Sequence, residues 1–130
     1  RIQLDGNGSS GEVLSSIVGE GGRMINETSI EANDSNTRGH IECDALLLND
    51  GIEFETIPKL KAKVKDTSLS HEASVGKISN DEIEYLRSKG FSEKKAVEMI
   101  VNGFSNNSVE DMPDIVKDQF RNILEKGSMM

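Results

Sequence analysis

The chain has 130 residues, 29% of them charged, and its 23 acidic against 15 basic side chains give a net charge of −8. Such a field repels phosphate backbones and anionic lipids, so we expect neither nucleic acid nor a membrane as partner. A single cysteine excludes an internal disulfide, and no apolar run reaches the roughly 18 to 20 residues of a membrane-spanning helix. We therefore expect a soluble protein of a reducing compartment, the cytoplasm. Its start at Arg1 without an initiator Met predicts a piece of something longer.

Polar and apolar residues tend to alternate from Arg1 to about Val75, between clusters of Gly, Asn, Asp and Ser, as in strands joined by turns. Pro58 is expected to break the last strand run in two. Beyond it, a lysine at every second position from Lys59 to Lys65 predicts a solvated face that protects the strand from edge pairing. A sandwich, a barrel and a β-solenoid all suit this pattern. The predicted strands cover residues 11–20, 23–31, 40–48, 52–57 and 59–65.

The apolar period changes to about 3.6 near residue 76, which predicts a β portion at 1–76 and a helical domain at 77–130. Ser79 and Glu82 have the spacing of a capping box, and Gly90 stands where a left-handed cap would end the first helix. The three predicted helices begin at Ser79 or Asn80, at Ser92 and at about Pro113.

Cys43 lies in an alternating stretch that places it on the same face as Ile41, Ala45 and Leu47. One interpretation is a small buried apolar side chain, because free cysteine is among the most buried residue types. The other is a thiolate ligand or nucleophile. Its two acidic neighbours disfavour a thiolate, although a bound metal would reverse that effect.

His71 and Glu72 pair an imidazole with a carboxylate in a polar stretch near the change from β to α. Adjacent residues of an extended strand face opposite ways, so these two would not readily share one metal ion there. His40 follows Arg38 and Gly39 and is predicted to be an ordinary turn or strand-edge residue.

Four segments, in this order and spacing, resemble the carboxy-terminal part of the SufB/SufD family: ECDALL at 42–47, SHEASVGKI at 70–78, YLRSKG at 85–90 and IVNGF at 100–104. The resemblance implies a mainly β fold with α, the end of a right-handed parallel β-helix (a β-solenoid) followed by a small C-terminal helical domain. It also implies a scaffold of the SUF iron-sulfur cluster assembly machinery that acts with the ABC-type ATPase SufC, and so a protein that is not itself an enzyme.

The resemblance also assigns candidate site residues. The cysteine of the SufB Cys-Asp-Ser/Ala motif, thought to hold the nascent cluster, falls on Cys43, and the histidine of the SufD Ser-His-Gly-Ala motif corresponds to His71. Ser70 replaces the first glutamate of the common SufB Glu-His-Glu-Ala motif and is SufD-like, while Glu72 is a further ligand or proton-handling candidate. Because a cluster has about four protein ligands, we expect a transient cluster shared between two subunits. These would form a homodimer or a SufB/SufD-type heterodimer of a SufBCD complex.

The helical domain is implied to dock the SufC-type ATPase, through a few aromatic or Arg anchors. The candidates are Tyr85, Arg87, Phe91 and Phe104. Two alternatives come from other classes of protein. The first is a non-catalytic structural or interaction module with Cys43 as a core residue, and the second is a Cys-His hydrolase, for which no nucleophile setting or oxyanion motif is visible.

Overall fold

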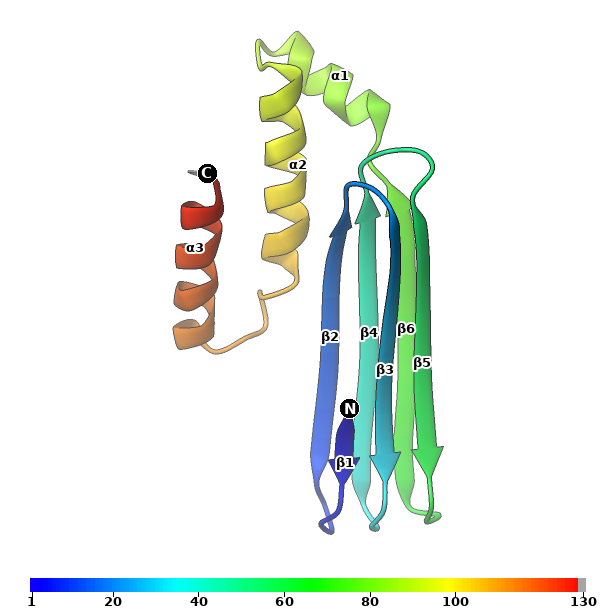
Figure 1. Cartoon of the computed structure of the whole chain (residues 1–130). Helices are drawn as coiled ribbons and strands as arrows, with labels where there is room; N and C mark the ends of the chain where they lie inside the picture. Colours follow the sequence, from blue (N-terminus) through cyan, green and yellow to red (C-terminus); the bar gives the residue numbers. More distant parts are fainter. Residues whose placement is uncertain (129–130) are drawn as a thin grey trace. The chain divides into compact units, whose positions relative to one another are not determined.

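The computed structural model describes residues 1–128, which divide into two compact units, Arg1–Lys77 and the part that begins at Ile78 (Figure 1). The first unit is built of strands and the second of helices, so the fold is mainly β with α, as predicted. The strands are β1 (Ile2–Leu4), β2 (Ser10–Gly19), β3 (Arg23–Ala32), β4 (Thr37–Leu47), β5 (Glu53–Ala62) and β6 (Thr67–Lys77).

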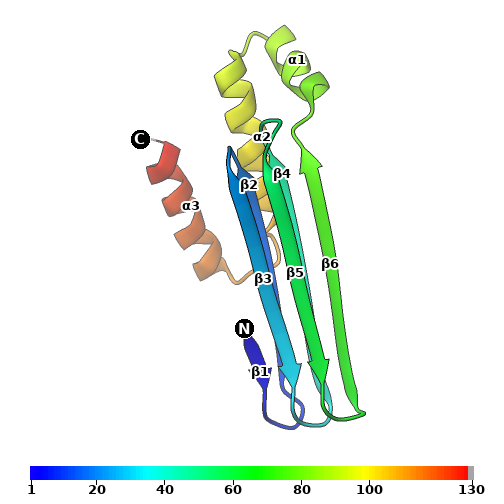
Figure 2. The ribbon, with the colours of Figure 1, turned by 45° about the vertical axis from the view of Figure 1, so that its right-hand side comes forward.

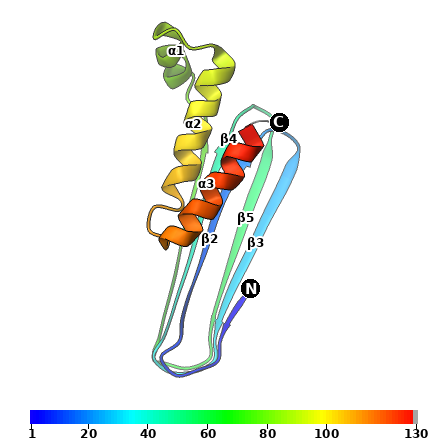
Figure 3. The ribbon, with the colours of Figure 1, turned by 90° about the vertical axis from the view of Figure 1, so that its left-hand side faces the viewer.

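The strands form two three-stranded sheets, ordered β1-β3-β5 and β2-β4-β6, and every pairing is parallel. Successive strands therefore alternate between the sheets, which lie as two layers in Figure 3, while Figure 2 shows β3 and β5 side by side. A parallel pair needs a long crossover between its strands. Here the intervening strand of the other sheet supplies it, so each strand pairs with the next but one along the chain. Ile2 thus lies beside Ile30, and Arg23 beside Glu53.

The core lies between the sheets and follows the two-residue period of the strands. Along β4, Ile41, Cys43, Ala45 and Leu47 are all buried, which confirms the predicted face. Each isoleucine side chain removed from water contributes about 1.5 to 3 kcal/mol. The main apolar cluster contains Leu4, Ile30, Ala32 and Ile41, with Ile2, Val13, Leu60 and Leu69 packed against it.

Two predictions about the strands are wrong. Pro58 does not break its strand: β5 runs unbroken from Glu53 to Ala62, with Pro58 paired to Thr28. Since β5 is at the edge of its sheet, the absent N–H of Pro58 is tolerated. Residues 67–77, where no strand was predicted, form the strand β6, most of whose residues are exposed and give no apolar period.

The second unit contains α1 (Asn80–Ser88), α2 (Glu93–Asn107) and α3 (Asp114–Ser128), close to the predicted starts. Ser79 accepts a hydrogen bond from the Glu82 amide at 3.4 Å, and Gly90 takes the left-handed φ of 98° that ends the first helix. Among the described residues, none of the helices combines the length and apolar character that crossing a membrane requires.

Candidate functional site

The pairing of β4 with β6 decides which candidate residues share a face. Ile41 pairs with His71, Glu42 with Glu72 and Cys43 with Ala73. Paired residues of parallel strands project to the same side of their sheet. Cys43 and His71 therefore lie on the inward face, which turns toward the other sheet, and Glu72 lies on the outward face.

On the inward face, Cys43 is 1% exposed, and Asn26 Nδ2 donates to its Sγ at 3.2 Å. Asn26 belongs to β3, so this bond joins the two sheets. Farther along the same face of β3, Thr28 is 8% exposed, and its Oγ1 has no hydrogen-bond partner among the described residues. The surroundings of the thiol are therefore partly polar. A cysteine that only fills apolar space in the core would not need such polar neighbours.

His71 shares the inward face with Cys43 but is exposed. It lies on β6, the edge strand of its sheet, shortly before Ala73, the partner of Cys43. Another molecule could therefore reach His71.

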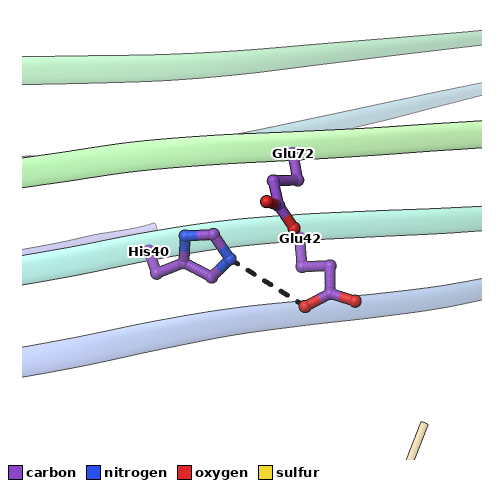
Figure 4. A group of neighbouring side chains, drawn as sticks. All are labelled: His40, Glu42 and Glu72. Atoms are coloured by element: carbon purple, nitrogen blue, oxygen red, sulfur yellow. Dashed lines mark ion pairs between the residues drawn. The ribbon is translucent and has the colours of Figure 1, made fainter. Parts of the chain in front are cut away.

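On the outward face, the structure brings Glu72 together with His40 and Glu42, whose potential ligand atoms all lie within 4.8 Å of one another (Figure 4). His40 Nε2 is 3.9 Å from Glu42 Oε2, and His40 Nδ1 is 2.8 Å from Ser70 Oγ. His40 lies inside β4, so its prediction as an ordinary turn or strand-edge residue is wrong. The signal that sequence analysis missed is the register, which sets His40 beside Ser70 and Glu42 beside Glu72.

The outward cluster carries excess negative charge. Burial raises the pKa of Glu42, and a hydrogen bond with Asp44 and the nearby charges of Asp44 and Glu72 raise it further, whereas His40 lowers it. In the described part of the chain, neither a Lys nor an Arg forms an ion pair with these three carboxylates.

The predicted partner-binding residues of the helical unit differ in exposure. Tyr85 is 62% and Phe91 is 40% exposed, whereas Phe104 is half-buried. Arg87 pairs with Glu84 at 2.7 Å on the surface of α1. Tyr85, Arg87 and Phe91 thus offer side chains that a partner could cover.

Comparison with known proteins identifies the family. Residues 1–104 match the family model described as "SUF system FeS cluster assembly, SufBD core domain". The chain therefore belongs to the SufBD family of iron-sulfur cluster assembly proteins, as its resemblance predicts.

Individual relatives support the same family assignment. The chain is 39% identical over 125 residues to an iron-sulfur cluster assembly SufBD family protein of Pyrococcus horikoshii, covering 95% of this chain and 28% of the relative. It is 34% identical to a protein of the same description from Archaeoglobus fulgidus, covering 96% and 34% of the two chains. Identity to the iron-sulfur cluster assembly protein SufB of Bacillus subtilis is 36%, covering 86% and 24%. The chain thus spans about a third or less of the length of these relatives.

Proposed function

We propose that this chain is part of a scaffold subunit of the SUF machinery and that Cys43 is a thiolate ligand of the nascent iron-sulfur cluster. The observation that carries the proposal is the Asn26 amide, 3.2 Å from a sulfur that is otherwise enclosed between two sheets. The contact places a polar group beside the sulfur atom that would bind the metal. The resemblance to the SufB motif assigns the same role to Cys43.

The fold proposed for this portion, residues 1–76, is the end of a right-handed parallel β-helix. Strands that alternate between two parallel sheets, each paired with the next but one along the chain, support it. Such a stack leaves β6 at an edge, where the inward-facing side chains from His71 to Lys77 are exposed.

His71 and Glu72 are the further proposed ligand or proton-handling residues. One cysteine cannot supply the about four ligands that a cluster usually takes. Exposure of His71 on the edge strand supports a transient cluster shared with a second subunit, in a homodimer or a SufB/SufD-type heterodimer. Glu72 faces outward, away from Cys43 of its own protomer, so its role at the cluster would also require that second subunit.

The helical domain, residues 77–130, is proposed to dock the SufC-type ATPase of a SufBCD complex in the cytoplasm. This chain would then serve assembly without catalysing a reaction. Tyr85, Arg87 and Phe91 support the role by their exposure, and the half-buried Phe104 is the fourth candidate anchor.

The test of Cys43 is anaerobic reconstitution with iron and sulfide, measured by visible absorbance and bound iron. We expect Cys43→Ser to lose most of the cluster and Ser15→Ala to keep it. Ser15 is a matched control because it pairs with Cys43 from β2 on the same inward face. Equal cluster content in the wild type and Cys43→Ser would overturn the assignment.

The test of docking is a pull-down of the ATPase by the full chain and by a version that ends at Lys77. Binding should be lost with the helices, while circular dichroism shows that the β unit remains folded. Undiminished binding by the shorter chain would refute docking through the helical domain.

A structural module with a core cysteine is the second candidate function, and the 1% exposure of Cys43 favours it. This alternative predicts no cluster in either protein of the reconstitution experiment. It also predicts that Cys43→Ser changes only stability.

A further inference from the structure

A second group of metal-ligating side chains lies on the opposite side of the sheet from Cys43. It consists of His40 and Glu42 of β4 and Glu72 of β6, and Figure 4 shows the three directed toward a common region. Because partners in β4 and β6 stand side by side, the register fixes the backbones that carry these ligands. Strands hold a ligand set more precisely than a loop does.

The imidazole of His40 is oriented by a second hydrogen-bonding group. Ser70 Oγ lies 2.8 Å from Nδ1, which leaves Nε2 on the side of the carboxylates. Histidines that bind metal typically use one ring nitrogen for the metal and the other for such a partner. Ser70 is therefore in the position that fixes the ring of a ligating histidine.

The spacing of the ligand atoms leaves room for an ion. Nε2 and Glu42 Oε2 are 3.9 Å apart, beyond the range of about 2.7 to 3.2 Å of an N–H···O hydrogen bond. Metal-nitrogen and metal-oxygen bonds of transition ions are about 2.0 to 2.2 Å long. An ion between the two atoms would thus replace a loose contact with two bonds.

Charge also favours a cation. Glu42 and Glu72 place two carboxylates near one imidazole, and Asp44 adds a third carboxylate beside Glu42. Across the described residues, neither a lysine nor an arginine forms an ion pair with them. A surface hollow beside His40, lined also by Glu12, Arg38 and Ser70, gives solvent access to the histidine. Water could therefore complete the coordination of an ion.

We propose that His40 Nε2 and the carboxylates of Glu42 and Glu72 bind a divalent first-row transition-metal ion. One nitrogen and two carboxylates suit Fe²⁺, Mn²⁺ or Zn²⁺ and provide no soft thiolate. The site shares Glu72 with the proposed cluster site but needs neither Cys43 nor sulfide, so it goes beyond the proposed cluster role.

The experiment titrates the full chain with Mn²⁺ in the absence of sulfide and follows the electron paramagnetic resonance signal of the free ion. We expect one ion per chain, and at least about tenfold weaker binding in His40→Gln and in Glu72→Gln, since even outer-shell changes cost about 10- to 100-fold. Glu55→Gln is the matched control, because it removes an exposed strand carboxylate from β5 of the other sheet.

Cys43→Ser separates this site from the cluster site and should leave Mn²⁺ affinity unchanged. Titration with Co²⁺ should give visible bands of nitrogen and oxygen ligation without a thiolate charge-transfer band. Should a ligand variant lose its circular dichroism signal, Ser70→Ala replaces it, because it keeps all three ligands and should weaken binding by about tenfold.

Absence of binding in the wild type, equal affinity in the ligand variants, or loss of binding in Cys43→Ser would each overturn the proposal. Reconstitution of the cluster is measured separately. A failure of one site therefore leaves the result for the other intact.

Discussion

Asn26 and Cys43 are joined across the interior of the β unit by a hydrogen bond from Nδ2 to Sγ of 3.2 Å. The residues are 17 positions apart and belong to different sheets. The bond gives a buried sulfur a polar donor and ties the two sheets to each other at the cysteine.

Replacing Asn26 with Leu should destabilise the β unit, because the hydrogen bond from Nδ2 to Cys43 Sγ between the two sheets is lost. A hydrogen bond contributes about 0.5 to 1.5 kcal/mol, so we expect the free energy of unfolding measured by urea denaturation to fall by about that amount. Thr56→Val is the control, since Thr56 pairs with Asn26 from β5 on the same face. An unchanged free energy of unfolding in Asn26→Leu would show that this bond does not stabilise the contact between the sheets.

Gly39 should not tolerate a methyl group. A Cβ at this buried position of β4 would lie 2.8 Å from Ile30 Cγ2 and 2.8 Å from Leu69 Cδ2. The isoleucine is 1% exposed and cannot move aside cheaply. Gly39→Ala should therefore lower the free energy of unfolding by about 1 to 3 kcal/mol, the usual cost of overpacking, as measured by urea denaturation.

Gly76→Ala is the matched control for this change. Gly76 is also a strand glycine, in β6, but a Cβ there meets nothing within 4 Å. The substitution should be neutral, or stabilising by about 0.4 to 1 kcal/mol through reduced freedom of the unfolded chain. Equal destabilisation by both substitutions would contradict the steric argument.

The lysines of the outer β5 face should contribute a pH-dependent stability. Lys59 donates a hydrogen bond to Glu27, and this bond, together with the lysine's charge, holds the pKa of Glu27 below its usual value. The unfolded state then binds more protons than the folded state in acid. The stabilisation is present above the ordinary glutamate pKa and is lost as the pH falls through the lowered value.

Lys59→Gln should therefore lower the urea midpoint at about pH 7, and the difference from wild type should shrink toward about pH 3. The difference should also shrink in about 1 M salt, where the Debye length is about 3 Å. Lys65→Gln removes the same charge beyond the end of β5 and controls for net charge. A difference that persists at low pH would point to packing by the lysine stem.

The sequence period was enough to predict the faces of single elements. Alternation placed Cys43 with Ile41 and Ala45 on the buried side of β4, and side-chain capping placed the start of α1 next to Ser79. These features depend on residues a few positions apart. Local chemistry determines them.

Prediction of the group of His40, Glu42 and Glu72 would have required the register of β4 and β6, which local sequence patterns do not contain. His40 and Glu72 are distant in the sequence and meet only because β4 pairs with β6, with Glu42 opposite Glu72. The exposed β6 carries no apolar alternation, so its pairing was invisible in the sequence. Glu72 drew attention only as the neighbour of His71 and through the family resemblance. The prediction that Pro58 breaks its strand was wrong for a related reason, since only the sheet order shows that β5 is an edge strand.

The start of α2 should depend on one hydroxyl group, that of Ser92, which accepts from the Lys95 amide at 3.2 Å. Ser92→Ala leaves that amide without its cap and should lower the stability of the helical unit by about 1 kcal/mol, whereas Ser92→Asp should restore the cap.

The chain has one tyrosine and no tryptophan, and Tyr85 lies in α1, so tyrosine fluorescence reports the helical unit directly. We expect the Tyr85 unfolding midpoint to fall in Ser92→Ala and to return in Ser92→Asp. A fall of equal size in both variants would mean that the serine acts through packing or solvation, because an aspartate accepts the same hydrogen bond and adds a favourable charge at the helix N-terminus.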